Sequence, residues 1–108
     1  MTDPFAPVKL GPITLRNRVI KAATYEGLAH DSRVTGELID FHRAYAAGGV
    51  GMTTVAYCAV APDGRTEANQ IQWTAEAMPG LRAFTDAMHA EGAAASAQIG
   101  HAGPVADP

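Results

Sequence analysis

The chain has 108 residues, 47% of them hydrophobic and 18% charged, a composition typical of one modest globular domain or of part of a larger one. A net charge of −3 argues against a nucleic-acid or anionic-membrane role, and no apolar run approaches the roughly 20 residues of a membrane-spanning helix. The single cysteine, Cys58, leaves no intrachain disulfide and no cysteine-based metal site, and it is compatible with a cytoplasmic location.

The first predicted elements are a hairpin and a strand. The segment VKLGPITL consists of two short apolar pieces separated by Gly11-Pro12, a pattern typical of a small hairpin or tight turn. Residues 18–23, RVIKAA, predict the first strand of a larger sheet. A polar, glycine-containing loop then extends to about Val34.

A helix is predicted from the N-cap residue Thr35 to about Ala47. Its apolar stripe has the spacing i, i+3, i+4, i+7 and is formed by Leu38, Phe41, His42 and Tyr45. The pair Gly48-Gly49 can end the helix in a left-handed conformation.

Two strands and a second helix follow. Residues Val50–Val60 form a nearly continuous apolar run rich in β-branched residues, which predicts a strand buried on both faces. The second helix is expected to begin near Thr74 or Pro79 and to end at Glu91, before Gly92. Residues Ala93–Ile99 predict the third strand. The inner face of the second helix is expected to carry Leu81, Phe84 and Met88.

Strands that alternate with helices predict an α/β fold with a parallel sheet. The pattern fits both a doubly wound sheet and a (β/α)8 barrel, and in both folds ligands bind at the carboxyl ends of the strands. Hydrogen-bonding side chains follow all three predicted strands, in the segments Ala22–Glu26, Ala56–Cys58 and Gln98–His101. Polar residues also occur at strand ends simply because such ends meet solvent. The small residues Ala22, Ala23 and Gly100 would leave backbone amides accessible to a flat ligand.

Gln98 carries both donors and an acceptor on one amide group. It can therefore pair with a urea- or imide-like edge such as the pyrimidine ring of a flavin, which an ionised carboxylate could not do. Other motifs are absent: the chain has no Walker A loop, no GxSxG and no HExxH, and its glycines do not form a dinucleotide fingerprint. We expect His42 and His89 to be packed or surface residues and Cys58 to be a core or pocket-edge residue. Nothing in the sequence marks Glu26, Asp31 or Glu37 as a catalytic pair.

Four segments together resemble the Old Yellow Enzyme family, the NADH:flavin oxidoreductases. They are PFAPVKLGPITLRNRVIKAA, GGVGMTTVAYCAVAPDGR, the W-T-x-E element at Trp73–Glu76, and AQIGHAGP. The resemblance implies an FMN-binding TIM (β/α)8 barrel, with a hairpin that plugs its bottom. We therefore expect residues 1–108 to be a single partial domain, the N-terminal portion of such a barrel. It would comprise the hairpin (1–17) and the strand–helix–strand–helix–strand part (18–108), about three β/α units.

The same resemblance implies site residues by position. The cofactor-binding residues would be Ala22, Ala23, Thr24, Tyr25, Tyr57 and Gln98. His101 would support the pocket. Tyr25 stands where many members carry Thr or Cys, and Pro104 replaces a common arginine. The family's substrate-anchoring residues lie on later strands, so no catalytic residue is assigned within this chain, and no metal ligand is expected.

The resemblance implies an FMN-dependent enzyme of the ene-reductase or dienoyl-CoA-reductase kind. NADH or NADPH would supply hydride through flavin N5 to an activated alkene or related electrophilic acceptor. An Fe–S cluster could lie only in a downstream region, and the remainder of the barrel or a homo-oligomer would complete the assembly. We expect no membrane or nucleic-acid partner. The alternative is a non-catalytic fragment or interaction module without flavin.

Overall fold

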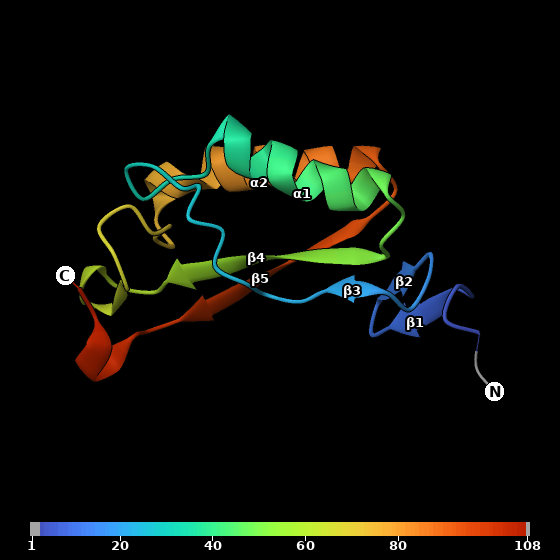
Figure 1. Cartoon of the computed structure of the whole chain (residues 1–108), viewed down its shortest axis with the longest axis horizontal. Coiled ribbons are helices and arrows are strands. Elements are labelled where there is room, and N and C mark those ends of the chain that lie inside the picture. Colours follow the sequence, from blue (N-terminus) through green and yellow to red (C-terminus); the bar gives the residue numbers. More distant parts are fainter. Residues whose placement is uncertain (1–2, 108) are drawn as a thin grey trace.

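The computed structural model describes residues 3–107 and contains two separate sheets and two long helices (Figure 1). In chain order the elements are β1 (Val8–Leu10), β2 (Ile13–Leu15), β3 (Ile20–Lys21), α1 (Gly36–Ala47), β4 (Met52–Ala59), α2 (Met78–Ala90) and β5 (Ala94–Gly100). Three short 3-10 turns lie at Pro62–Gly64, Ala75–Ala77 and Gly103–Val105. The order confirms the predicted hairpin followed by alternating strands and helices.

The hairpin pairs β1 with β2 in antiparallel register, with Leu10 opposite Ile13. The turn between them uses Gly11 at a φ of +57°, a conformation that glycine adopts without steric cost. Leu15 is 2% exposed and anchors the hairpin to the rest of the molecule. Figure 1 shows the hairpin beside the start of β3, at the opposite end of the sheet from the carboxyl ends of the strands.

The main sheet has the strand order β3-β4-β5, and both pairings are parallel. The predicted first strand was too long, because only Ile20 and Lys21 pair with β4, opposite Met52 and Thr53. Beyond Lys21 the chain leaves the ladder, and the Glu26 carboxylate accepts the hydrogen bond of a β4 amide, Ala56 N–H. The burial predicted for the second strand is confirmed, since six of the eight β4 residues are buried.

Helix α1 begins as predicted. The Thr35 hydroxyl accepts a hydrogen bond from Leu38 N at 3.1 Å and donates to Leu28 O at 2.6 Å. The predicted stripe is only partly correct: Leu38 and His42 are buried, whereas Tyr45 is 42% exposed and Ala46 takes the inner position. At the helix end it is Gly49, not Gly48, that adopts a positive φ.

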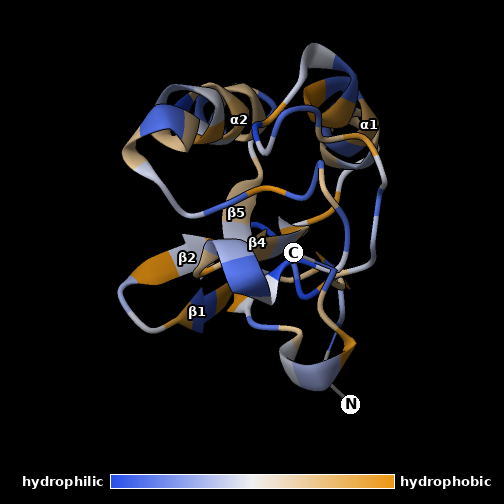
Figure 2. Ribbon diagram, turned by 90° about the vertical axis from the view of Figure 1, so that its left-hand side faces the viewer, coloured by the Kyte–Doolittle hydropathy of each residue, from blue (hydrophilic) through white to orange (hydrophobic). Residues whose placement is uncertain are grey.

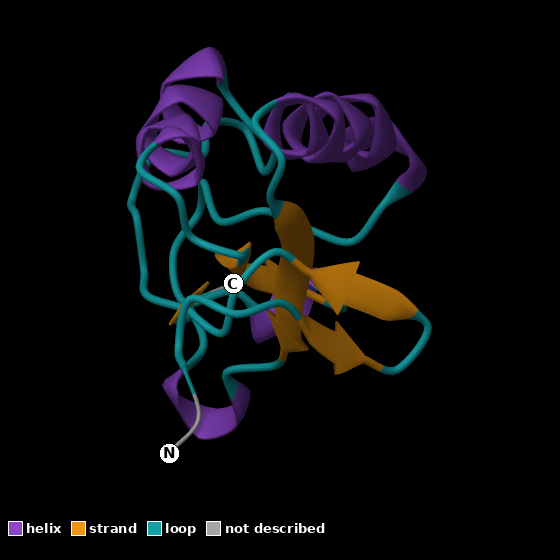
Figure 3. Ribbon diagram, turned by 90° about the vertical axis from the view of Figure 1, so that its right-hand side faces the viewer, coloured by secondary structure: helices purple, strands orange, loops and turns teal. Residues whose placement is uncertain are grey.

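Helix α2 also follows the predicted pattern. A 3-10 turn capped by Thr74 leads into the helix, Pro79 lies in its first turn, and Gly92 follows its end at a φ of +82°. The predicted inner residues Leu81, Phe84 and Met88 are all buried. Figures 2 and 3 show both helices together over one face of the sheet, so the core lies between the helices and this face.

Arg16, at the end of the hairpin, connects the carboxyl ends of both helices. Its guanidinium donates to Val50 O, to Glu91 O at 2.7 Å and to Ala46 O at 2.6 Å. A cation at the end of a helix also complements the helix dipole. A side chain at Gly92 would lie 2.7 Å from the Arg16 guanidinium, so the absence of a Cβ there makes room for this contact.

We expect Arg16→Met to lower the free energy of unfolding by about 2–4 kcal/mol, because three carbonyl groups lose a charged donor. Arg16→Lys should recover only part of this loss, since an ammonium group cannot reach all three carbonyls in the same planar geometry. Urea denaturation followed by circular dichroism measures both changes. Arg18→Met is the matched control, because no side-chain hydrogen bond of Arg18 occurs within residues 3–107. Equal destabilisation by Arg16→Met and Arg18→Met would contradict the assigned role.

Candidate functional site

The carboxyl ends of the three parallel strands open onto two adjoining clefts. One, of about 250 Å³, is lined by residues that include Tyr57, Thr66, Gln98 and His101. The other is lined by Tyr25, Tyr57, Thr66 and Glu67. Because Tyr57 and Thr66 line both clefts, the structure brings four of the sequence-predicted site residues, Tyr25, Tyr57, Gln98 and His101, into one continuous region.

A β-bulge in β4 determines which way Tyr57 faces. Val55 pairs with Ala97 and Cys58 pairs with Ile99, so Ala56 and Tyr57 together oppose the single residue Gln98. The extra residue returns Cys58 to the helix-covered core beside Val55. It also places Tyr57 against Gly100, where an added Cβ would lie 3.3 Å from the Tyr57 ring. The Tyr57 hydroxyl donates to Gly64 O at 2.6 Å, which fixes the ring over the strand end.

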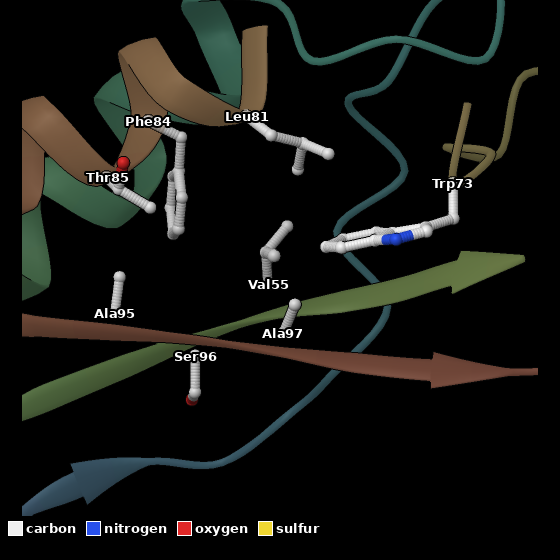
Figure 4. A pocket seen from close by; sticks show the side chains of 8 residues that line it. All are labelled: Val55, Trp73, Leu81, Phe84, Thr85, Ala95, Ser96 and Ala97. Atoms are coloured by element: carbon white, nitrogen blue, oxygen red, sulfur yellow. The ribbon is translucent and has the colours of Figure 1, made fainter. Parts of the chain in front are cut away.

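Gln98 lies on the face of the sheet that the helices do not cover. Side chains alternate along a strand, and the neighbouring Ser96 points away from the helices in Figure 4. Ser96 Oγ is hydrogen-bonded to Thr54 Oγ1 at 2.8 Å on that same face. Gln98 is exposed, and within residues 3–107 its amide makes no hydrogen bond. Its donors and its acceptor are thus available to a ligand.

The segment after β3 presents backbone groups and a phenol. No backbone carbonyl in the described part of the chain accepts from the amides of Ala23, Thr24 or Tyr25. The Thr24 hydroxyl accepts from Lys21 Nζ at 2.9 Å, and Ala22 O accepts from the same ammonium group.

Tyr25 is 63% exposed. A hydrogen bond to the Glu67 carboxylate, followed by partial burial and the charges of Glu67 and Glu26, raises the pKa of the Tyr25 phenol. The phenol therefore stays protonated, with its one O–H group directed to the Glu67 carboxylate.

His101 holds the loop after β4 against the end of β5. Its Nδ1 accepts from Gly103 N at 2.9 Å, so in the neutral ring Nε2 carries the proton and donates to Asp63 Oδ1 at 3.2 Å. The ring packs on Gly64, where a Cβ would lie 2.6 Å from the imidazole. These contacts agree with a supporting role, and any direct contact between His101 and a ligand stays a prediction.

A buried polar cluster of Glu26, His42 and Thr53 lies near the site, and it was not predicted from the sequence. Glu26 Oε2 lies 2.6 Å from His42 Nε2 and accepts from Ala56 N at 3.1 Å. His42 Nδ1 lies 2.7 Å from Thr53 Oγ1. The side chains of His42 and Glu26 are 0% and 2% exposed. One signal was available: a histidine in the apolar stripe of a helix must find a polar partner when it is buried.

Cys58 is fully buried, as predicted for a core residue. Burial, with a smaller contribution from the negative charge of Glu26, raises the pKa of its thiol to about 11. The thiol is therefore neutral at physiological pH and unsuited to nucleophilic or redox chemistry. Among the described residues no group of three or more His, Cys, Asp or Glu side chains could hold a metal ion. Within the same residues no helix is long and apolar enough to cross a membrane.

A third cleft, of about 220 Å³, lies between α2 and the sheet (Figure 4). Trp73, Leu81 and Phe84 form one side of it, and Val55, Ala95 and Ala97 form its floor. Its lining contains no titratable side chain, whereas the clefts at the strand ends are lined by Tyr25, Glu67 and His101 among others.

The parallel strands and the ligand-accessible groups at their carboxyl ends define an α/β unit with a candidate ligand site at one edge of its sheet. The profile of the NADH:flavin oxidoreductase / NADH oxidase family matches residues 3–107, and the chain belongs to this family. The resemblance to Old Yellow Enzymes is thereby confirmed.

Curated and solved relatives agree with this assignment. The chain is 57% identical over 103 residues to the 4,4'-dithiodibutanoate disulfide reductase of Rhodococcus erythropolis, and the match covers 95% of this chain and 26% of that enzyme. The structure superposes on 2-naphthoyl-CoA reductase with a TM-score of 0.91 at 28% identity, covering 96% of this chain and 16% of that one. For morphinone reductase with tetrahydroNAD the TM-score is 0.84 at 27% identity, with coverages of 98% and 29%.

These solved enzymes are (β/α)8 barrels, which decides between the two folds that the sequence left open. The described residues form an α/β portion of such a barrel and do not close it. The chain spans about a quarter of the length of its disulfide reductase relative.

The raised pKa of Cys58 predicts slow thiol modification. At pH 8 about one thiol in a thousand would be ionised, so the native protein should react with Ellman's reagent at least about a hundredfold more slowly than urea-unfolded protein. The rate should rise as the pH approaches 11, because the thiolate fraction rises. Native protein that reacts as fast as unfolded protein at pH 8 would contradict the burial of Cys58.

Proposed function

We propose that this chain supplies part of the FMN site of an oxidoreductase that passes hydride from NADH or NADPH to a small electrophilic acceptor. The observation that carries the proposal is the unpaired, exposed amide of Gln98 beside Tyr57 at the strand ends. Family membership supports FMN as the cofactor and a nicotinamide nucleotide as the reductant.

The groups present at the strand ends fit a flavin. A pyrimidine edge carries donors and acceptors side by side, and the Gln98 amide offers the complementary set. The backbone amides after β3 add donors for ring oxygens and nitrogens, and the protonated phenol of Tyr25 adds one more when it turns from Glu67 to the ring. Small residues, Ala22 and Ala23 at one strand end and Gly100 at another, leave room for a flat ring system.

Each residue would have a positioning or electrostatic role. Gln98 would hold the pyrimidine edge, and Tyr25 would donate a hydrogen bond near the redox-active part of the ring. Donors at these positions stabilise the more electron-rich reduced flavin. Ala22, Ala23 and Thr24 would line the ring, with Tyr57 packed beside it and His101 supporting the loop below. When bound, FMN supplies the hydride transfer, and the protein orients and tunes it.

We propose an activated alkene or a small organic disulfide as the acceptor. In alkene reduction a hydride adds to the β-carbon and a proton to the α-carbon. In disulfide reduction a hydride and a proton cleave the S–S bond to two thiols. The second class is favoured by the disulfide reductase that shares 57% identity with this chain. We further propose a cytoplasmic protein, in which residues 1–108 form one partial domain that is completed by further barrel elements or by a homo-oligomer.

A second candidate function is that of an interaction module without flavin. It is favoured by the position of β5 at the edge of the sheet and by Ile99, which is 58% exposed. The two candidates differ in their absorbance spectra. Stoichiometric FMN bands in the purified protein would support the oxidoreductase. A protein that is colourless after incubation with FMN and removal of the unbound flavin would support the module.

The flavin assignment predicts the behaviour of two Gln98 variants in the full-length protein. Gln98→Ala removes the paired amide, and Gln98→Glu keeps its size but leaves only acceptors when ionised. We expect both to weaken FMN binding by about tenfold or more, the scale of a lost hydrogen-bonded pair in a buried site. Fluorescence titration of FMN measures the affinity, and dye-coupled potentiometry measures the reduction potential, which should fall.

Lys9→Ala is a suitable control, because Lys9 is exposed and lies in β1 of the hairpin, at the opposite end of the sheet from the carboxyl ends of the strands (Figure 1). Its affinity for FMN should equal that of the unmodified protein. Unchanged affinity and unchanged potential in both Gln98 variants would overturn the assignment of Gln98.

A further inference from the structure

Tyr57 owes its orientation to the bulge in β4, and the bulge has a buried anchor. Ala56, the other residue of the bulge, lies three positions beyond Thr53, the last β4 residue that pairs with β3. Its N–H donates to Glu26 Oε2 at 3.1 Å. The Glu26 carboxylate thus accepts a hydrogen bond from a backbone amide of β4 at a position beyond the end of β3.

Helix α1 in turn holds the carboxylate. His42 Nε2 lies 2.6 Å from the same oxygen, and Thr53 Oγ1 lies 2.7 Å from His42 Nδ1. The His42 ring also packs edge-on against Phe41 and Phe84. Since the side chains of His42 and Glu26 are 0% and 2% exposed and Thr53 is fully buried, these contacts hold the carboxylate in one well-defined position.

Glu26 also follows directly on Tyr25 in the sequence. A single side chain therefore connects two segments that reach the candidate flavin site, one from the end of β3 and one from the middle of β4. A residue that only filled the core would not need to contact the bulge amide. The negative charge of Glu26 also acts on its surroundings, since it contributes to the raised pKa of the Cys58 thiol.

The geometry points to Glu26 as a positioning residue for the proposed flavin site, one that holds the β4 bulge and thereby the orientation of Tyr57 and the path of the Tyr25 segment. Its effect on flavin rests on the proposed function, whereas its effect on the bulge does not. Within residues 3–107 Glu26 makes no hydrogen bond to Gln98, so it acts only through His42 and Ala56.

The experiment uses the full-length protein, labelled with ¹⁵N, with and without FMN. Amide hydrogen exchange at Ala56 and Tyr57 reports on the bulge without any cofactor. FMN affinity and the flavin absorbance spectrum report on the site. The variants are Glu26→Ala, which removes the carboxylate, and Glu26→Gln, which keeps an oxygen that can accept from Ala56 N–H.

We expect Glu26→Ala to speed exchange at Ala56 and Tyr57 by about tenfold or more and to weaken FMN binding to a similar extent, as the loss of a hydrogen bond to a charged group would do. Glu26→Gln should restore most of both properties. Thr53→Val keeps the shape but removes the hydroxyl that holds His42, and we expect it to raise Ala56 exchange by about threefold. This variant decides the question if Glu26→Ala fails to fold.

Two controls separate positioning from general stability. Leu81→Ala destabilises the same core without touching this chain of contacts, and Glu37→Ala removes an exposed carboxylate from the first turn of α1. The proposal is overturned by unchanged Ala56 exchange in Glu26→Ala and Thr53→Val. It is equally overturned if Leu81→Ala, at matched loss of stability, weakens FMN binding as much as Glu26→Ala. If the unmodified protein binds no FMN, the proposed function fails, and the exchange rates alone decide the role of Glu26 in the bulge.

Discussion

The pairing of two β4 residues, Ala56 and Tyr57, against the single residue Gln98 of β5 is the constraint on which the candidate site depends. In an uninterrupted strand, Tyr57 would follow the alternation of Val55 and point into the helix-covered core. Cys58 would then leave that core for the opposite face. The extra residue reverses both orientations. The small Cys58 thiol is therefore buried in the core, and the Tyr57 ring lies at the strand ends.

The position of the bulge also explains why the surrounding contacts are polar and buried. A bulge leaves a backbone group without its ladder partner, and a buried N–H group without a partner destabilises the fold. Here the Glu26 carboxylate accepts from that amide, and His42 and Thr53 in turn hold the carboxylate. Arg16 stabilises the opposite end of the sheet by similar means, with carbonyl groups as its partners. The apolar core between helices and sheet lies between these two polar anchors.

The order of elements, the hairpin, the N-cap at Thr35 and the inner face of α2 could all be predicted from the sequence, because each follows from local propensity and periodicity. The length of β3 could not, since Ala22 and Ala23 fit a strand by composition and nothing in their residue types shows that the pairing with β4 ends at Lys21. The bulge was also beyond prediction, because the run Val50–Val60 is apolar throughout and carries no mark of a changed register. The prediction that Tyr45 faces the core was wrong, because the small residue Ala46, one position further along, takes the inner position.

The grouping of Tyr25, Tyr57, Gln98 and His101 could be predicted from a general rule, that the carboxyl ends of parallel strands meet at one edge of a sheet. Their contact with FMN is the central claim, and a crystal structure of the full-length protein with FMN tests it most directly. The account predicts the Gln98 amide within about 3 Å of the flavin's pyrimidine edge, with the Tyr57 ring beside it and the Glu26–Ala56 hydrogen bond intact. A flavin bound elsewhere, with the Gln98 side chain turned to solvent, would contradict it.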